Sequence, residues 1–336
     1  MADYLKILGG EELAQISVQF DYKNATADFV GLKLMPMVKT ENMKVAMYNL
    51  LKGAEIPVIA LVHAFDSEAR IGDRPNYEEF KETLFLIKEK INQGEELRKK
   101  IKDMGMTSNE STIINAIYDD ISNEIAKVLT AFERRACELL ATGKIVIDEN
   151  GAKYTVDYHL DAKNKVDFAS WGVASHDILA DIVSLKNASK NKIVRMIMST
   201  KTMGYILGNT VLTEIASKAG VYVTQDWVKT YIMSQFGIEI IVDDRTFKTA
   251  YNGGKEYRFF PEDTVISLTT RGKVGKTFMG STPTEDAGAT DTTYGFVAVH
   301  QWKSDDPYTT WTKAEGVGLP VIADINNVLY ISKVSA

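Results

Sequence analysis

The strongest periodic pattern in the chain is a long run in which apolar residues recur at steps of three and four. It begins after Thr107-Ser108-Asn109-Glu110, whose Thr-x-x-Glu form is that of a capping box at a helix start. Gly143 follows the run, in the position where glycine commonly ends a helix. We therefore expect one amphipathic helix from Thr107 to Thr142, about 50 Å long. Its apolar stripe consists of Ile114, Ile117, Ile121, Ile125, Val128, Phe132, Ala136 and Leu139, and the charged residues expected on its other faces are Asp119, Asp120, Glu124, Lys127, Glu133, Arg134 and Arg135.

A helix of this length is either the mechanical backbone of a domain or one strand of a coiled coil. The chain shows no obvious second heptad pattern that could pair with it. This favours the mechanical backbone.

Two strand-like patterns flank this helix. Downstream, 145–147 and 154–158 are short apolar strands joined by a turn-prone segment, which predicts a hairpin. Upstream, the apolar run 56–62 and the segment 80–87 are separated by a polar loop at 66–75 with charges of both signs. The second of these segments fits a strand or a helical stripe equally well. The loop tip either lies in water or docks on charged neighbours.

The first fifty residues mix short apolar groups with polar ones, and we interpret them as an arm with one short helix. Pro36 favours an extended path because its φ is fixed and it lacks an N–H. The methionines of this arm either pack against the body or form an adaptable contact surface; they are Met35, Met37, Met43 and Met47.

From Ser175 onward helices alternate with strands, which predicts an α/β layer. The expected helices are 175–188, with Ser175 as its N-cap, 201–218 and 225–236, and the expected strands are 193–198 and 238–242. Beyond Gly254 the chain becomes rich in strands, with a loop at 281–293. The strand candidates there are 264–270, 294–302, 308–313, 320–325 and 328–334.

Composition narrows the classes of function. The 39 Lys and Arg against 45 Asp and Glu give a net charge of −6, which argues against a protein that grips nucleic acid through phosphate neutralisation. No apolar run reaches the ~18 residues of a membrane helix, and Met1–Lys6 lacks the basic flank of a secretory signal, so we expect a protein made and used in solution. The single Cys137 forms no internal disulfide. The histidines have no metal-ligand spacing, so we expect no metal and no cofactor.

Motifs for catalysis do not withstand a test of their context. The segment 271–277 looks like the end of a phosphate-binding loop, but Thr270 stands where glycine is required and no helix pattern follows. The neighbours 175–177 have the residue types of a Ser-His-Asp triad, yet adjacent side chains point in different directions. Cys137 lies near the apolar side of the long helix, as an inert thiol would. We expect no catalytic residues.

Three passages and the order of the elements are similar to the lambda capsid protein E family of tailed bacteriophages. The resemblance covers nearly the whole chain. The passages are Glu133-Arg134-Arg135-Ala136-Cys137-Glu138-Leu139-Leu140-Ala141-Thr142-Gly143-Lys144-Ile145-Val146-Ile147, Tyr257-Arg258-Phe259-Phe260-Pro261-Glu262-Asp263-Thr264-Val265 and Gly318-Leu319-Pro320-Val321-Ile322-Ala323-Asp324.

The resemblance implies an α+β chain with the Hong Kong-type capsid fold. It implies an N-terminal arm at 1–55 and an E-loop hairpin at 56–90. It further implies a P-domain with a spine helix at 107–165, an inserted α/β A-domain at 168–258, and P-domain strands with the C-terminus at 262–336. The ambiguous segment 80–87 becomes a strand.

The implied function is that of a major capsid protein, which forms the icosahedral shell around phage double-stranded DNA without sequence-specific binding. Identical subunits would form pentamers and hexamers in the virion capsid, assembled in the host cytoplasm. The implied partners are a separate scaffolding protein and a portal, and a decoration protein is compatible with them. Contacts at the E-loop tip would come from Glu68, Arg70, Asp73 and Arg74, and covalent cross-linking is not expected because 66–75 contains no lysine.

Two other functions remain as alternatives. The first is an encapsulin-like cellular compartment that holds a cargo enzyme. The second is an enzyme that binds a small molecule at the α/β layer. The polar residues after its strands that such an enzyme could use are Ser199-Thr200-Lys201 and Asp243-Asp244-Arg245.

Overall fold

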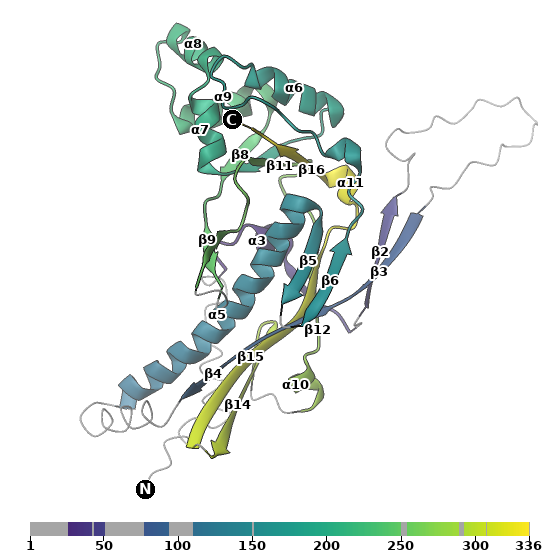
Figure 1. Ribbon diagram of the computed structural model, residues 1–336, viewed down its shortest axis with the longest axis vertical. Helices are drawn as coiled ribbons and strands as arrows, with labels where there is room; N and C mark the ends of the chain where they lie inside the picture. Colours follow the sequence, from purple (N-terminus) through teal and green to yellow (C-terminus); the bar gives the residue numbers. More distant parts are fainter. Residues whose placement is uncertain are drawn as a thin grey trace, which may run out of the picture.

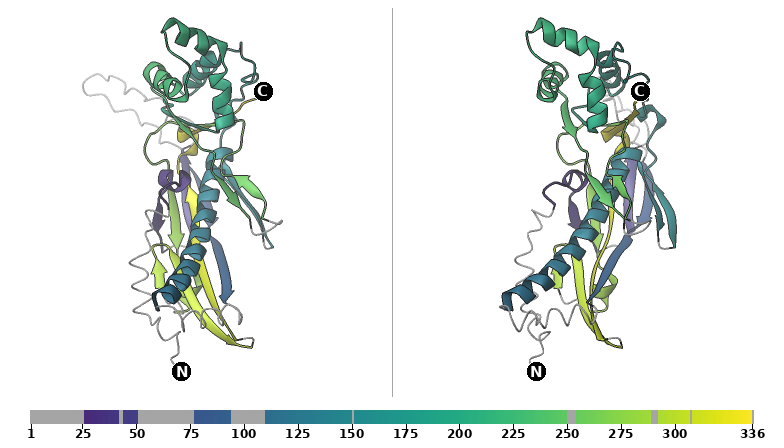
Figure 2. Two further views of the ribbon diagram at one scale, coloured as in Figure 1. Left: turned by 90° about the vertical axis from the view of Figure 1, so that its left-hand side faces the viewer. Right: turned by 60° about the vertical axis from the view of Figure 1, so that its left-hand side comes forward.

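The protein is elongated, with a long helix on a sheet, an α/β layer at one end and a hairpin that projects from the side (Figures 1 and 2). The computed structural model describes residues 26–41, 44–50, 77–93, 110–149, 151–249, 254–288, 292–306 and 308–335. Within these residues no helix has both the length and the hydropathy needed to cross a membrane.

The long helix α5 runs from Glu110 to Thr142 along the axis of the molecule (Figure 1). It ends as expected, because Gly143 adopts a φ of +74° and donates its N–H to the carbonyl of Leu139. The first residues of the expected capping box, 107–109, lie outside the described residues.

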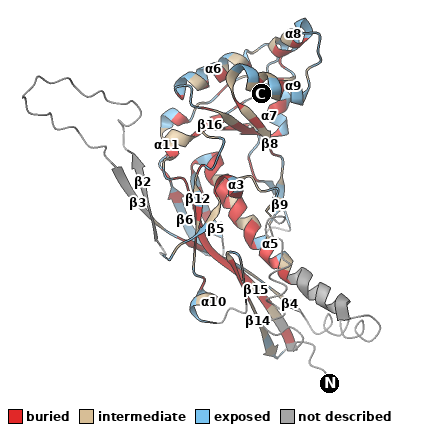
Figure 3. Ribbon diagram, turned by 180° about the vertical axis from the view of Figure 1, so that it is seen from behind, coloured by how far each residue is buried: buried red, intermediate tan, exposed pale blue. Residues whose placement is uncertain are grey.

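One expectation about the faces of α5 is wrong. Glu124, Glu133 and Arg135 were expected on polar faces, but all three are buried, and Glu133 has no exposed surface. Figure 3 shows the carboxyl-terminal part of the helix as mostly buried, because strands and the N-terminal arm enclose it on several sides. Its apolar stripe is confirmed where side chains are described, by Ile121, Ile125, Val128, Phe132, Ala136 and Leu139.

The helix packs on a six-stranded sheet whose central strand is β15 (Tyr308–Val321). One edge of β15 pairs with β4 (Phe85–Gln93), and the other pairs first with β14 (Val297–Asp305) and then with β12 (Lys276–Gly280). The sheet is completed by β13 (Thr292–Tyr294) on β14 and β1 (Met37–Lys39), which lies parallel to β12. The expectation of two strands at 308–313 and 320–325 is therefore wrong: one long strand reaches Val321, and Ile325–Val328 forms the short helix α11.

Glycines in β15 allow the helix to lie directly on the strand. A Cβ added at Gly316 would come within 2.9 Å of Cε2 of Phe132, and one added at Gly318 within 2.9 Å of the carbonyl oxygen of Phe278. Phe132 is fully buried and stacks on Phe85 with ring centroids 5.9 Å apart. The two glycines therefore leave space for this aromatic pair between helix and sheet.

Replacing Gly318 by alanine should lower the free energy of unfolding by about 1–3 kcal/mol, because the added methyl group overpacks the interface. The matched control is Gly204→Ala in α7 (Thr200–Leu207), where an added Cβ meets no atom within 4 Å. The control should be neutral or gain up to about 1 kcal/mol from helix propensity. Urea denaturation of both variants compares the two, and equal stability would contradict the close packing.

The α/β layer contains a four-stranded sheet in the order β16 (Leu329–Lys333), β11 (Thr264–Leu268), β7 (Arg195–Met198) and β8 (Glu239–Val242). Strands β7 and β8 are parallel, as the alternation of helices and strands predicts. The strands β11 and β16 come from the range 262–336, so this sheet joins that range to 168–258.

The two faces of this sheet contribute side chains to two different hydrophobic cores. Ile197 of β7 belongs to the core around α5, while its neighbours Met196 and Met198 belong to the core under the helices of the α/β layer. Such alternation follows from the two-residue period of a strand. In the same way, Ile266, Leu268, Leu329 and Ile331 face the first core, and Val265, Tyr330 and Ile240 face the second.

The helices of the layer correct two expectations. Helix α6 (Ile178–Ala188) is capped by Asp177, whose carboxylate accepts the N–H of Ala180, so Ser175 is not the N-cap. The expected helix 201–218 is two helices, α7 (Thr200–Leu207) and α8 (Thr210–Lys218), because Asn209 caps α8 through the N–H groups of Val211 and Leu212. Helix α9 (Gln225–Phe236) has the expected limits.

The remaining elements are short. The expected hairpin is confirmed as β5 (Lys144–Glu149) and β6 (Ala152–Asp157), and β9 (Thr246–Lys248) pairs with β10 (Glu256–Arg258). The arm contains the short helix α3 (Gly31–Leu34), and a 3-10 turn, η1, spans Ala162–Asn164. The expected loop at 281–293 includes the short helix α10 (Pro283–Asp286). This helix begins with a complete capping box formed by Thr282 and Glu285.

Candidate functional site

A two-stranded hairpin projects from the body of the protein (Figure 1). It consists of β2 (Lys44–Leu50) and β3 (Tyr77–Thr83), which are antiparallel and paired in continuous register from Lys44 with Thr83 to Leu50 with Tyr77. The strand β2 lies upstream of the expected run 56–62, which is outside the described residues. The expected tip residues Glu68, Arg70, Asp73 and Arg74 are also outside the described residues.

The hairpin is firmly joined to the body by the chain that follows it. After β3 the chain passes through the buried Leu84 and enters β4, which pairs with β15 from Phe85 to Gln93. Phe85 is buried against Phe132 of the long helix. The strand interpretation of 80–87 is confirmed, and the helical alternative is wrong, because β3 and β4 cover this segment. The hairpin is therefore continuous with a strand of the central sheet.

The N-terminal arm is held by a buried carboxylate. Oε1 of Glu133 accepts the backbone N–H groups of Val30 at 2.7 Å and Gly31 at 2.9 Å, and Oε2 accepts that of Leu32 at 2.7 Å. These three donors lie at the start of α3, where the first N–H groups of a helix have no partner within the helix. Glu133 thus satisfies the start of the arm helix from more than 100 residues away.

The same carboxylate binds the loop after β8. Nη2 of Arg245 lies 2.9 Å from Oε1 of Glu133, and the guanidinium also binds both carboxylate oxygens of Asp243. Burial disfavours the charged guanidinium, but its hydrogen bonds and the charges of Asp243 and Glu133 outweigh this cost and raise the pKa of Arg245 above its ordinary value. We call the donors of Val30, Gly31 and Leu32 together with Glu133, Asp243 and Arg245 the arm clamp.

Cys137 lies one helical turn from Glu133 in the same contact. Its thiol is fully buried, and Sγ lies 3.4 Å from Oε1 of Glu133. Burial, together with the charge of Glu133, raises the pKa of Cys137 well above its ordinary value. The expectation of a buried thiol is confirmed.

The polar residues proposed for an enzyme do meet at the carboxyl ends of β7 and β8, but they pair with one another and with neighbouring side chains. The N–H of Thr200 donates to Asp244, which also pairs with Arg258 at 2.6 Å. Lys201 pairs with Asp263 and Glu262, and Asp263 also accepts the hydroxyl of Tyr205. These polar groups therefore form a network of internal hydrogen bonds and ion pairs at the edge of the layer.

The other motifs tested for chemistry have structural roles. Nε2 of His176 lies 2.7 Å from Asp181, which also accepts the indole N–H of Trp171, so the ring does not join Ser175 and Asp177 in a triad. The segment 271–277 leads into β12 rather than a helix, and Lys273 and Lys276 are exposed. Across the described residues no group of three or more His, Cys, Asp or Glu could hold a metal ion.

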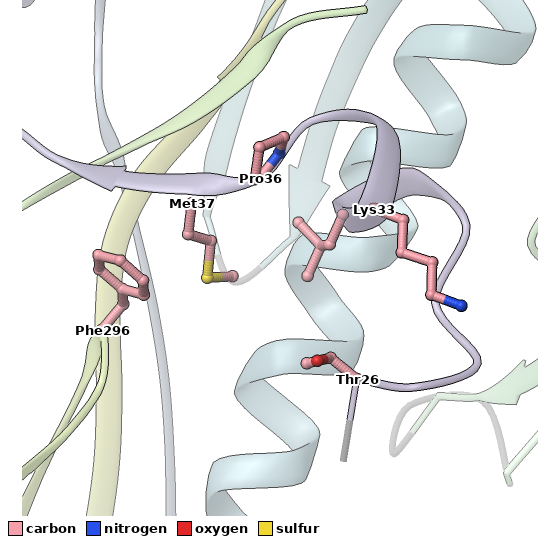
Figure 4. Close-up of a pocket in the computed structure, with 6 residues that line it drawn as sticks. Thr26, Lys33, Pro36, Met37 and Phe296 are labelled. Atoms are coloured by element: carbon pink, nitrogen blue, oxygen red, sulfur yellow. The ribbon is translucent and has the colours of Figure 1, made fainter. Parts of the chain in front are cut away.

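A small open cavity of about 240 Å³ lies between the arm and the turn before β14 (Figure 4). It is smaller than a typical ligand pocket of about 300–1,000 Å³. Its lining is mostly apolar, with Thr26 and Lys33 as polar members, so it has no set of convergent polar groups that would orient a ligand. The lining consists of Thr26, Leu32, Lys33, Pro36, Met37 and Phe296.

The sequence pattern missed the arm clamp. Glu133 stands among charged residues of an amphipathic helix, and nothing in its spacing distinguishes a buried carboxylate from a solvated one. Arg245 was noted only as a polar residue after a strand. The one available signal was Gly31, since a glycine beside an apolar segment can mark a close approach of backbone to another element. The arm clamp could be found only from contacts between distant segments.

Comparison with known proteins gives one family and several similar structures. The family model described as phage major capsid protein E matches residues 16–331. The candidate capsid protein of a prophage in Escherichia coli CFT073 is 14% identical, with a TM-score of 0.64 and coverage of 98% of this chain and 99% of that chain. A phage-related protein from Bordetella bronchiseptica RB50 is 12% identical, with a TM-score of 0.54 and coverage of 96% and 95%. No curated protein matches the chain.

Proposed function

The chain belongs to the phage major capsid protein E family, and from this premise we propose how it builds a shell. Its role is that of a structural protein of the virion capsid, and its α+β fold is the Hong Kong-type fold of tailed-phage capsids. Family membership supports a phage head over an encapsulin-like compartment. The family match carries the proposal, and the projecting hairpin and the clamped arm supply the physical means of assembly.

Identical subunits associate into pentamers and hexamers through segments that reach beyond their own body. The base of the E-loop is β2 and β3, and its tip reaches a neighbouring subunit, where backbone pairing and apolar burial of about 25 cal/mol per Å² hold the two together. The N-terminal arm before α3 acts as a second such segment. Many joints of this kind, each weak alone, stabilise a closed shell.

The shell has further partners. A separate scaffolding protein directs assembly in the host cytoplasm, a portal occupies one vertex, and a decoration protein can bind the finished surface. The enclosed double-stranded DNA is held without sequence-specific contacts, which agrees with a net charge of −6.

Electron microscopy tests the proposed assembly. The protein is expressed alone and with a candidate scaffolding protein, then observed by negative stain. Closed shells, tubes or sheets of capsomers are expected. Only monomers or dimers across a range of salt and protein concentrations would contradict self-assembly.

Reversing the charges of the E-loop tip should weaken assembly without unfolding the subunit. The variant Arg70→Glu with Arg74→Glu replaces two cations, so complementary charges on a neighbour would repel the tip. We expect soluble subunits and a yield of particles reduced about tenfold, measured by sedimentation and microscopy. The control Arg70→Lys with Arg74→Lys keeps the charge and should assemble. Unchanged particle yield in the reversed variant would refute a role for the tip charges.

A further inference from the structure

The arm clamp joins three segments that are distant in the sequence. The donors at 30–32 belong to the N-terminal arm, Glu133 to the spine helix and Arg245 to the loop that leaves β8 of the α/β layer. Oε1 of Glu133 is shared, because it accepts the arm N–H groups of Val30 and Gly31 and also the guanidinium. The arm and the loop after β8 therefore both donate hydrogen bonds to the same buried carboxylate oxygen, Oε1 of Glu133.

We propose that the arm clamp couples docking of the N-terminal arm to the order of the loop 243–245, so that release of either segment loosens the other. The coupling is a property of the single subunit, and only its use during shell assembly rests on the proposed function. An arm drawn away by a neighbouring subunit would thus change the edge of the α/β layer of its own subunit.

Electrostatics predicts that docking of the arm and order of the loop 243–245 favour each other. With the arm docked, Glu133 has no exposed surface, and its attraction for Arg245 acts in a medium of low dielectric constant. When the arm leaves, water reaches the carboxylate and weakens that attraction. When Arg245 leaves instead, Glu133 stays buried without its counter-charge, which makes the docked arm unfavourable. Each segment therefore stabilises the other, and coupling of this kind is reciprocal.

Close packing makes the docked arm specific. An added Cβ at Gly31 would lie 2.8 Å from Cβ of Ala136, 3.0 Å from Oε2 of Glu133 and 3.1 Å from Sγ of Cys137. Only glycine allows the arm backbone to approach the helix this closely. The guanidinium of Arg245 is fixed from its other side, because it lies 5.0 Å from the ring centroid of Phe259 and binds Asp243.

Two readouts report the two halves of the clamp. Cys137 is the single cysteine of the chain and lies under the arm, so the rate at which Ellman's reagent labels its thiol measures arm release. Hydrogen exchange in a peptide covering 243–248 measures the order of the loop. Exchange in α9 serves as the reference, since a global loss of stability would raise exchange there as well.

The test uses one substitution in the arm and one in the loop 243–245, and it measures the effect of each substitution on the other segment. Gly31→Ala displaces the arm and should raise exchange in 243–248 about tenfold, while Arg245→Met frees the loop and should raise labelling of Cys137 about tenfold. The control Arg195→Met removes a guanidinium from a pair with Glu239 outside the clamp and should change neither readout.

The proposal is wrong if Gly31→Ala raises only the labelling of Cys137 and Arg245→Met raises only the hydrogen exchange in 243–248, while exchange in α9 is unchanged. If Gly31→Ala does not fold, Arg245→Met decides the matter, because labelling of Cys137 at the wild-type rate would by itself contradict the proposal. Both measurements use soluble subunits. A subunit that shows the coupling but forms no shells would refute the proposed assembly and leave the arm clamp intact.

Discussion

Replacing Ile121 by aspartate should abolish folding of the subunit. Ile121 is fully buried in the core between the spine helix and the sheet. An unpaired carboxylate there costs several kcal/mol in desolvation, and the lost apolar packing adds about 2–5 kcal/mol. Together these losses are comparable to the whole free energy of unfolding of a typical domain, which is about 5–15 kcal/mol. We expect insoluble protein or a soluble species without a cooperative thermal transition, measured by circular dichroism and size-exclusion chromatography.

The control for this variant is Asn123→Asp, two residues further along the same helix. Asn123 is exposed, so the same charge is added in water, and the stability should change by no more than about 0.5 kcal/mol. A folded Ile121→Asp subunit with a wild-type transition would show that the helix does not form the core as described.

Replacing Glu133 by alanine should produce the second largest loss of stability. The substitution leaves the N–H groups of Val30, Gly31 and Leu32 without their acceptor and deprives Arg245 of one of its two carboxylates. Removing one partner from a buried ion pair typically costs about 3–5 kcal/mol, because the remaining charge is left uncompensated. Urea denaturation should show this decrease in the free energy of unfolding.

Glu262→Ala is the matched control. Glu262 also pairs with an arginine, Arg258 at 3.0 Å, but the two side chains are 40% and 36% exposed. Exposed pairs contribute about 0–1 kcal/mol, so the control should remain within that range of the wild type. Equal losses in both variants would indicate that burial of the Glu133 carboxylate has no special effect on stability.

The elements that follow from local patterns were predictable. The spine helix, the hairpin of β5 and β6, and helix α9 each depend on neighbours within a few residues: an apolar stripe, a turn or a glycine stop. The errors occurred where two local signals competed. Ser175 and Asp177 are both residue types that cap helices, and Asp177 is the one that caps α6. Asn209 falls within a helical pattern, but its side chain caps α8.

Non-local elements were less predictable. Two separate strands were expected at 308–313 and 320–325, whereas the chain forms one long strand, β15, whose glycines make room for Phe132 of the spine helix. The placement of β11 beside β7 and of β16 beside β11 also depends on pairing between segments more than 60 residues apart. Strand pairing of this kind is selected by burial on both faces, which a single segment does not reveal.

The candidate site shows the same division. The resemblance to a phage capsid family was visible in the order of the elements and in three passages, and the family match confirms it. The charged tip residues Glu68, Arg70, Asp73 and Arg74 remain a prediction, since they lie outside the described residues. Of the arm clamp, only Gly31 left a signal in the sequence.

The long helix and the alternation that builds the α/β layer follow from the amino-acid sequence, because hydrophobic periodicity acts over short distances along the chain. The class of protein came from the resemblance to a capsid family, which the family match confirms. Which charged residues of the long helix are buried depends instead on tertiary contacts. Glu124, Glu133 and Arg135 have the same residue types as their solvated neighbours, and their burial depends on segments that fold over them from elsewhere. For Glu133 those segments are the arm and the loop after β8, which supply the donors that make a buried carboxylate stable.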